Sequence, residues 1–324
     1  ITEAAVAEYL AARDNIGRLF LGKYSVVTTS GTSGVPLTMV RDSFHNIIHG
    51  ALIGERFFKD LDPGLVNPER HRIAAVIATD SFSSSFTSFK RARNANPEFA
   101  PNMLAISILS PVAEIVEKLN AHQPDLLTGY PSVLAALALE KMKGNLKITP
   151  QAVACSAEQL TNTAYVTMKR AFNCPILNNY CSTEGGEAAM MCADGNLHLN
   201  DDWVIMEPVD QDDRPVAEGE ISSAVLITNL ASFTQPIIRY RLEDRVRIFA
   251  TPCTCGSNLP VMEIMGREGD TICLDGKIIP AVVFQVLMYK VAGTLLFQFV
   301  QTGPDRLELR VRLLEGVLKL LLIT

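Results

Sequence analysis

The chain has 324 residues, of which 48% are hydrophobic and 20% are charged, and this composition is typical of a globular protein with a large core. Its formal net charge of −6 and pI near 5.5 argue against nucleic acid as a partner, because phosphate binding needs clustered lysine and arginine. The sequence has no apolar run of about 18 residues, so we expect neither a transmembrane helix nor a membrane partner.

The N-terminal stretch 1–15 predicts an amphipathic helix and lacks the basic-then-apolar order of a signal peptide. The chain has seven cysteines, an odd number for a disulfide framework. Without an export signal, these cysteines indicate a reducing cytoplasm, where they would serve as core residues or metal ligands.

Apolar, β-rich runs alternate with longer helical patterns over the first half of the chain. The predicted strands cover 72–79, 103–109, 125–130, 151–157 and 175–180, and the predicted helices cover 110–122, 130–144 and 161–172. Continuous apolar strands separated by helices predict an α/β fold with mainly parallel sheets covered by helices. Ligands bind at the carboxyl ends of such strands, so we look for the site there.

After about residue 187 the pattern changes to short strands separated by turns, which predicts a β-rich subdomain over roughly 187–265. Glycine and charge are concentrated at 265–277, so we place a domain boundary there. The prediction is an N-terminal domain over 1–266 and a small, partial α+β domain over 267–324. The small domain would have a helix at 281–290 and strands in "TLLFQFVQTG" and "DRLELRVRL".

The segment "TTSGTSGVP" (28–36) is polar, flexible and uncharged. Glycines let backbone N–H groups turn toward an anion, and hydroxyl side chains add donors, so the segment suits a phosphate-binding loop. It is not a Walker A loop, since G-x-x-x-x-G-K-[ST] is absent. Taken alone, the segment fits a serine- and glycine-rich hairpin turn better.

Five blocks in a fixed order change that interpretation: "TTSGTSGVP", "CSAEQL" (155–160), "NNYCSTEGG" (178–186), "YRLEDR" (240–245) and "GREGDTICLDGK" (266–277). Together they resemble the adenylate-forming (acyl-activating, ANL) superfamily over roughly residues 24–280. "GYPSVL", "FTQPIIRYRLEDR", "CTCG" and "IMGREGD" are similar to its phenylacetate–coenzyme A ligase branch. The resemblance implies an enzyme that activates a carboxylic acid with ATP as an acyl-adenylate and releases pyrophosphate. The acyl group would then pass to CoA or another acceptor, such as a carrier-protein thiol or an amine.

The resemblance also implies roles for individual residues. Glu184 would hold Mg²⁺, while Thr183 at the α-phosphate and Arg267 near the domain junction would complete the catalytic group. Tyr180 would stack on adenine, and Asp244 would accept hydrogen bonds from the ribose. The other implied ATP contacts, from the phosphate loop, the adenine pocket and the α-phosphate site, are Thr29, Ser30, Gly31, Thr32, Ser33, Gly34, Ser156, Ala157, Glu158 and Ser182, and the implied hinge is Asp270.

Each of these residues also has an ordinary structural interpretation. Tyr180 would then be a strand-end tyrosine, Glu184 a solvated loop acid, and Asp244 the partner of Arg241 or Arg245 in a surface ion pair. The order of the five blocks favours the nucleotide-binding roles.

Two departures from the family pattern support an alternative function. The phosphate loop of the family commonly continues Gly-Lys-Pro, whereas this chain has Val35 between Gly34 and Pro36. No segment after residue 280 matches the C-terminal Gly-Lys lysine of the family. The alternative is a nucleotide- or acyl-adenylate-binding protein of the same fold with weak or no adenylation activity.

A second group of residues is Cys192, His198, Cys253 and Cys255. Three thiolates and an imidazole suit a closed, tetrahedral structural Zn²⁺ site, although the two halves are far apart in the sequence. Some members of the resembled branch carry a metal at similar positions. Buried free cysteines are the alternative, and a zinc-containing scaffold without the enzyme activity is a third functional class.

The expected acyl pocket lies between the strand-end loops and the helix that carries Tyr130. In "DSFSSSF" (80–86), Phe82 and Phe86 flank a serine run, and they would form an apolar pocket wall or simply pack in the core. An apolar wall with hydroxyls suits an aryl acid as the substrate. The short N-terminal part resembles stand-alone adenylating proteins of secondary metabolism, such as one used in phenazine antibiotic assembly, and a homodimer is compatible with this resemblance.

Overall fold

The computed structural model describes residues 1–29, 37–59, 61–79, 81–250, 252–267, 271–274, 277–280 and 294–313. The largest element is a mixed nine-stranded sheet with the order β13-β14-β9-β8-β7-β6-β5-β3-β4. Its strands are β3 (Ile73–Ile77), β4 (Met103–Ser107), β5 (Leu126–Gly129), β6 (Ala152–Cys155), β7 (Ile176–Ser182), β8 (Gly186–Met191), β9 (Leu197–Leu199), β13 (Asp244–Phe249) and β14 (Val261–Arg267). The predicted α/β class is confirmed.

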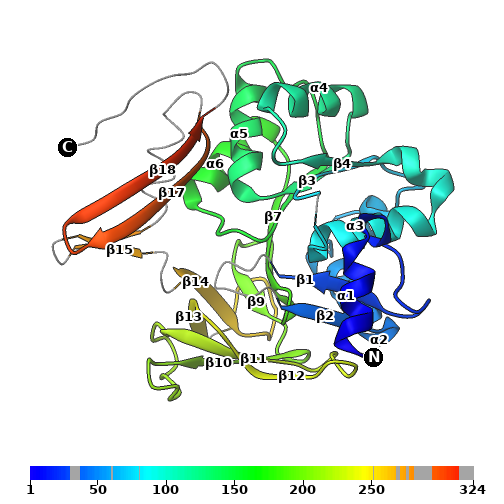
Figure 1. The fold of residues 1–324 in the computed structure, drawn as a ribbon. Coiled ribbons are helices and arrows are strands. Elements are labelled where there is room, and N and C mark those ends of the chain that lie inside the picture. Colours follow the sequence, from blue (N-terminus) through cyan, green and yellow to red (C-terminus); the bar gives the residue numbers. More distant parts are fainter. Residues whose placement is uncertain are drawn as a thin grey trace.

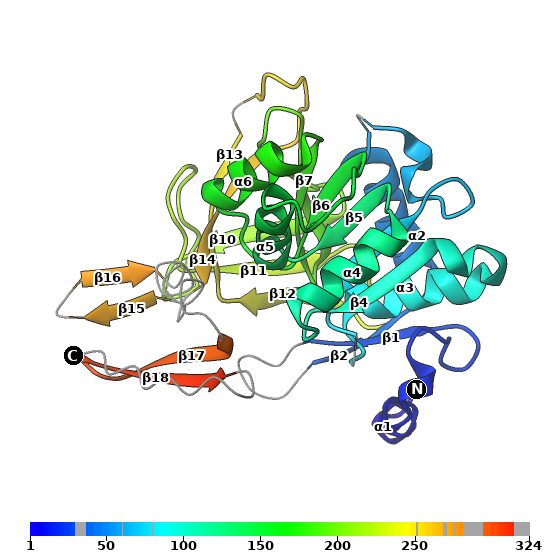
Figure 2. The ribbon, with the colours of Figure 1, turned by 90° about the horizontal axis from the view of Figure 1, so that it is seen from above.

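Strands β3 to β7 form the parallel half of this sheet and coincide with the predicted strands. Helices α4 (Val112–His122), α5 (Pro131–Met142) and α6 (Asn162–Phe172) cover one face, as Figure 2 shows. Because side chains alternate along a strand, Ala74 and Val76 face these helices, and Ala75 and Ile77 face the other side. That side is covered by α2 (Ser43–Leu52), the short helix η2 (Ile53–Phe57) and α3 (Ser84–Ala95).

The β-rich part of the chain continues the same sheet in antiparallel form. The turn after β7 leads directly into β8, and β9, β14 and β13 follow outward. Strands β10 (Val204–Val209), β11 (Ala224–Asn229) and β12 (Ile237–Leu242) form a separate antiparallel sheet, which lies at one end of the molecule in Figure 1. The two sheets share a hydrophobic core that includes Tyr180, Ile227 and Val246.

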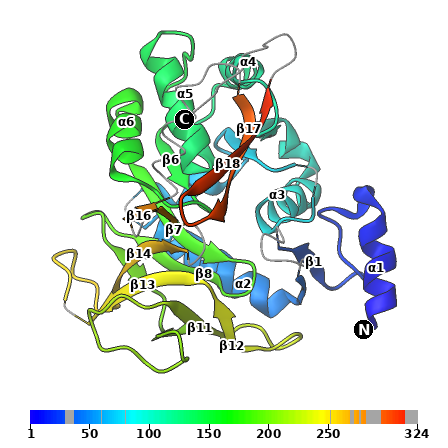
Figure 3. The ribbon, with the colours of Figure 1, turned by 60° about the vertical axis from the view of Figure 1, so that its left-hand side comes forward.

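The N-terminal part consists of the predicted helix, α1 (Glu3–Ala11), and an antiparallel hairpin of β1 (Ser25–Thr28) and β2 (Thr38–Arg41). Thr28 lies opposite Thr38, so the polar segment described above joins two paired strands. In Figure 3, α1 lies on the opposite side of the molecule from α6.

Two further hairpins belong to the C-terminal part: β15 (Thr271–Leu274) with β16 (Lys277–Pro280), and β17 (Thr294–Gly303) with β18 (Arg306–Leu313). The second pair matches the two strands predicted there. The predicted helix at 281–290 lies outside the described residues. Among the described helices, none has the length and apolar character needed to cross a membrane.

Candidate functional site

Three loops meet at the carboxyl ends of β5, β6 and β7. The Ser156 N–H donates to the Gly129 carbonyl over 3.2 Å. The Glu158 carboxylate accepts a hydrogen bond of 3.1 Å from the Ser132 N–H, in the first turn of α5. Ala157 has the left-handed φ of 65°, and its N–H bonds to the sulfur of Cys181. The loop after β6 is therefore tied to the loops on both sides of it.

The loop after β7 is a tight turn from Ser182 to Gly185. The Ser182 hydroxyl accepts a hydrogen bond of 2.8 Å from the Gly185 N–H, and the Asn229 amide donates to the Glu184 carbonyl over 3.1 Å. Gly186 follows with a φ of 69°, and a Cβ there would lie 2.0 Å from Cε1 of His49. Glycine at this position lets the turn pass closely over the buried His49 ring.

Glu184 is the buried acid of this turn, with only 8% of its surface exposed. Burial raises the pKa of its carboxyl group, with a smaller contribution from the nearby charge of Asp244, while Arg267 and Arg41 oppose the rise. The alternative interpretation of Glu184 as a solvated loop acid is therefore wrong. A buried carboxylate whose charged form is disfavoured is a typical ligand for a cation.

Asp244 and Arg267 face each other across the β13–β14 pair. They are register partners, and Arg267 Nε lies 3.2 Å from Asp244 Oδ1. Arg241, one alternative partner of Asp244, instead pairs with Asp213 and Glu243. Asp244 thus pairs with Arg267 on the neighbouring strand, and the predicted surface ion pair with Arg241 is wrong.

Tyr180, near the end of β7, lies beside the Asp244 carboxylate, and only 8% of its surface is exposed. Burial raises the pKa of the Tyr180 hydroxyl, and the neighbouring charge of Asp244 adds to the rise. The structure thus brings Tyr180, Glu184, Asp244 and Arg267 together from three separate blocks of sequence.

Thr29 closes the base of the β1–β2 hairpin. Its hydroxyl accepts a hydrogen bond of 2.9 Å from the Leu37 N–H, and its own N–H donates to the Leu37 carbonyl over 2.9 Å. The remaining phosphate-loop residues and the implied hinge lie outside the described residues: Ser30, Gly31, Thr32, Ser33, Gly34 and Asp270.

Gln235 is a contact that the sequence analysis missed. Its side-chain oxygen accepts from the Val40 N–H over 2.9 Å, and its nitrogen donates to the Thr38 carbonyl over 3.0 Å. Gln235 thereby pairs with the outer edge of β2 as a neighbouring strand would. The only sequence signal was its place within "FTQPIIRYRLEDR".

The three residues predicted for the acyl pocket lie in different environments. Phe82 and Phe86 are buried in a cluster with Ile16 and Ile77, which is the core-packing alternative. Tyr130 immediately precedes α5, at the carboxyl end of β5, and its hydroxyl accepts a long hydrogen bond of 3.5 Å from the Ala78 N–H. Contact of these three side chains with a substrate stays a prediction.

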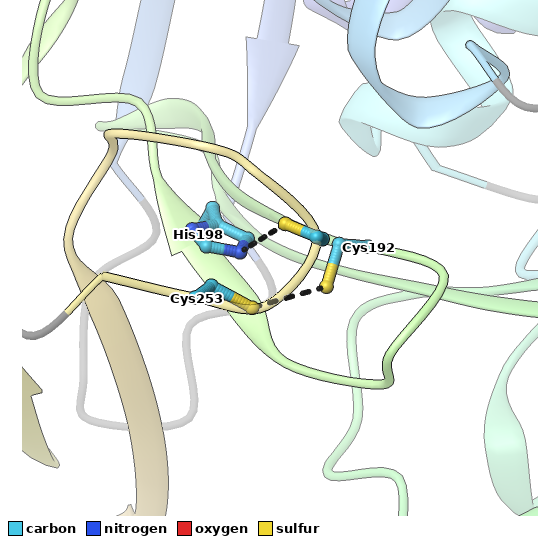
Figure 4. Close-up of side chains that lie close together, drawn as sticks. Cys192, His198 and Cys253 are labelled. Atoms are coloured by element: carbon cyan, nitrogen blue, oxygen red, sulfur yellow. Dashed lines mark hydrogen bonds between the residues drawn. The ribbon is translucent and has the colours of Figure 1, made fainter.

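The ligand atoms of Cys192, His198, Cys253 and Cys255 all lie within 4.8 Å of one another. Cys192 Sγ is 4.0 Å from Cys253 Sγ, and Cys255 Sγ is 3.3 Å from His198 Nε2. Figure 4 shows Cys192 and His198, from around β8 and β9, pointing toward Cys253 on the facing loop.

Two contacts around this cluster suit metal binding, although burial raises the pKa of the Cys192 thiol to about 11. His198 Nδ1 lies 2.9 Å from the Leu259 carbonyl, so a proton on Nδ1 leaves Nε2 free to bind the metal. The N–H of Cys255 lowers the pKa of the Cys253 thiol to about 6, which favours a thiolate at that position. The donor set and its arrangement fit a tetrahedral zinc ion.

This chain is similar to known proteins mainly in its three-dimensional structure, and less in its sequence. No protein-family model matches the chain. Protein CapK of Staphylococcus aureus is 30% identical over 159 residues, which cover 48% of this chain and 34% of CapK.

Solved structures match over most of the chain. A 2-hydroxyisobutyryl-CoA ligase in complex with R3-HIB-AMP matches with a TM-score of 0.64 and 18% identity, over 95% of this chain and 65% of that one. The anthranilate CoA ligase AuaEII in complex with anthranoyl-AMP has a TM-score of 0.57 and 13% identity, over 91% and 57% of the two chains. ATP-bound MatB from Rhodopseudomonas palustris has a TM-score of 0.56 and 14% identity, over 90% and 58%. The chain thus spans less than two thirds of each of these proteins, and at this identity the likeness establishes a shared fold.

Proposed function

We propose, from the fold that this chain shares with the adenylate-forming acyl-CoA ligases, that it activates a carboxylic acid with ATP as an acyl-adenylate. The predicted superfamily resemblance is confirmed at the level of that fold. The observation that carries the proposal is the meeting of Tyr180, Glu184, Asp244 and Arg267 at the carboxyl ends of the central strands. These residues come from separate sequence blocks, and their meeting gives an aromatic ring, two acids and a cation to one site.

Each residue has a role in this proposal. The Tyr180 ring packs against adenine, and the Asp244 carboxylate accepts hydrogen bonds from the ribose. Arg267 is held at the site by Asp244 and neutralises phosphate charge when it moves toward the nucleotide. Glu184, beside the hydroxyl-bearing residues Ser182 and Thr183, would hold Mg²⁺, whose charge would offset that of the phosphates.

The chemistry needs positioning more than acid–base groups. An oxygen of the substrate carboxylate attacks the α-phosphorus in line, the bond to the β-phosphate oxygen breaks, and pyrophosphate leaves. The site residues orient the two reactants and neutralise the charge that gathers on the phosphate oxygens. No general base is required, because the attacking carboxylate is already ionised at neutral pH.

The finer parts of the proposal concern the substrate and the acceptor. We propose an aryl acid and transfer to CoA, in the manner of the phenylacetate–CoA ligase branch and compatible with a role in antibiotic biosynthesis. The 2-hydroxyisobutyryl-CoA ligase has been solved with CoA, and AuaEII with anthranoyl-AMP, which supports both choices by analogy. The domain division at residues 266 and 267, a mobile C-terminal domain hinged at Asp270 and a cytoplasmic location belong to the same proposal.

The four-residue cysteine and histidine cluster would hold a structural zinc ion. Cys192 directly follows β8 and His198 lies within β9, while Cys253 and Cys255 lie in the loop between β13 and β14. A metal there would join two segments about 60 residues apart in sequence and leave no open position for chemistry.

A second candidate function is binding of a nucleotide or an acyl-adenylate without efficient adenylation. The observation in its favour is Val35, which stands where the resembled family commonly has a phosphate-binding lysine. One assay separates the candidates: exchange of labelled pyrophosphate into ATP over a panel of aryl, alkyl and hydroxy acids. Exchange with any acid supports the enzyme, AMP binding without exchange supports the second candidate, and no nucleotide binding contradicts both.

A further inference from the structure

Arg41 is a buried arginine between the hairpin and the turn of the candidate site. It is the last residue of β2, and 7% of its surface is exposed. One terminal nitrogen donates to the Thr183 carbonyl over 2.6 Å, and the other donates to the Ser84 hydroxyl over 2.8 Å. One guanidinium thus joins the end of β2 to the turn after β7 and to the start of α3.

Arg41 makes no direct ion pair with another residue that the structure describes. Among the described residues, no carboxylate lies within ion-pair distance of the guanidinium, and its Nε atom is buried without a hydrogen-bond partner. Burial lowers the pKa of Arg41 to about 10, while Glu187 and Glu184 raise it from a greater distance and Arg91 lowers it. Arg41 is therefore still charged at neutral pH, in surroundings that make a buried charge costly.

Packing alone does not explain a cation at this position. An apolar side chain of similar volume would avoid the cost of burying the charge, and buried ion networks replaced in this way often lose no stability. The Thr183 carbonyl, however, would then lose its donor, and the turn that carries Ser182, Thr183 and Glu184 would lose a fixed point. The contacts of Arg41 are directed at that turn.

We infer that Arg41 is a positioning residue that couples the β1–β2 hairpin to the Ser182–Gly185 turn, so that the end of β2 and the proposed metal-binding acid keep a fixed relative position. This inference rests on the proposed function. It also gives the site a fixed cation near Glu184, although the phosphate loop itself has Val35 in place of lysine. Lysine would not replace Arg41, because its single nitrogen does not reproduce the planar fork that serves two acceptors at fixed angles.

The test compares Arg41→Lys with the unmodified full chain. We expect kcat of ATP–pyrophosphate exchange to fall by about 10-fold or more, because misplacing a catalytic turn by about 1 Å can cost up to 100-fold in rate. KM for MgATP should change less than kcat, since the nucleotide contacts themselves remain. The control is Arg239→Lys, at an exposed arginine paired with Glu207, which should leave both constants unchanged.

Hydrogen–deuterium exchange of the free protein gives a readout that does not depend on activity. The Gly185 N–H bonds to Ser182, and the Glu187 N–H bonds to His49 Nδ1 over 3.1 Å. In Arg41→Lys, a peptide spanning 180–187 should exchange faster, while a peptide from β6 should keep its protection. Equal exchange over 180–187, or a loss of kcat that only follows the folded fraction, overturns the inference.

These two readouts also separate the inference from the function. If the unmodified chain shows no pyrophosphate exchange with any acid, the proposed activity fails, and deuterium exchange alone decides whether Arg41 positions the turn. If the chain is active and Arg41→Lys matches it in kcat and in deuterium exchange, the function stands and the inference fails.

Discussion

Replacing Cys255 by serine tests whether the cysteine and histidine cluster holds a zinc ion. In a tetrahedral site with Zn–S of about 2.3 Å and Zn–N of about 2.0–2.1 Å, sulfur–sulfur edges are about 3.8 Å and sulfur–nitrogen edges about 3.5 Å. The corresponding distances here are 4.0 Å between Cys192 and Cys253 and 3.3 Å between Cys255 and His198. These two edges lie within about 0.2 Å of those of a tetrahedral zinc site, and Cys255→Ser removes one of the four ligands.

The size of the effect follows from linkage between metal binding and folding. A ligand present at about 1,000 times its Kd stabilises the folded state by about 4 kcal/mol. For a chain of 324 residues, with an unfolding entropy of about 2.1 cal/mol/K per residue, this corresponds to about 6 °C in Tm. We therefore expect Cys255→Ser, or a zinc chelator added to the unmodified protein, to lower Tm by up to about 6 °C.

The assay combines metal analysis of the purified protein with thermal unfolding. The unmodified chain should contain one zinc per chain and lose Tm with chelator, and Cys255→Ser should contain less zinc and respond less to chelator. Cys174→Ser is the matched control, because Cys174 is a buried cysteine outside the cluster, so its zinc content should be unchanged. A protein without zinc whose Tm responds to neither zinc nor chelator refutes the reasoning.

Three further predictions concern the turn after β7 and Asp244, the proposed ribose-binding acid. Glu184→Gln should abolish pyrophosphate exchange yet raise Tm. Because burial raises the pKa of Glu184, the unmodified protein loses stability as pH rises through that pKa. The difference in Tm between the variant and the unmodified protein should therefore be small in acid and larger at neutral pH, and a difference that does not change with pH contradicts this prediction. Asp244→Asn should raise KM for ATP by about 10-fold, the equivalent of about 1.4 kcal/mol. An unchanged KM would contradict the proposal that Asp244 binds the ribose. In urea unfolding, Gly186→Ala should lower the free energy of unfolding by more than Gly195→Ala does. Both glycines have a positive φ, but only at position 186 would the added Cβ also lie against His49. Equal losses of unfolding free energy would show that the contact with His49 is unimportant.

The parallel half of the fold was predictable from local patterns. Continuous apolar runs such as 73–77 and 126–129 can be buried on both faces only in a covered parallel sheet, and helical periodicity lies between them. The antiparallel continuation was harder to predict, because short strands with turns are compatible with a separate subdomain or an extension of the same sheet. The pairing of β7 with β8 joins β8, β9, β14 and β13 to the central sheet, while β10, β11 and β12 form a sheet of their own.

The candidate site was predicted as a list of residues, and its geometry was not. The order of the sequence blocks named Glu184, Asp244 and Arg267, but the pairing of Asp244 with Arg267 depends on the register of β13 and β14. The contacts of Arg41 with Thr183 and of Gln235 with Val40 were not predictable because each joins residues more than 140 positions apart in the sequence. Nothing local distinguishes them from other polar residues.

The sequence by itself determined the strand and helix types, the polar segment between β1 and β2, and the residue types available for nucleotide and metal binding. These properties depend on periodicity, composition and short motifs, which are local. Only the tertiary structure decided that Glu184 is buried, that Arg267 faces Asp244 and that the four cysteine and histidine ligands meet. Those outcomes depend on strand register and on contacts between distant segments, where a shift of one residue would turn every side chain to the opposite face.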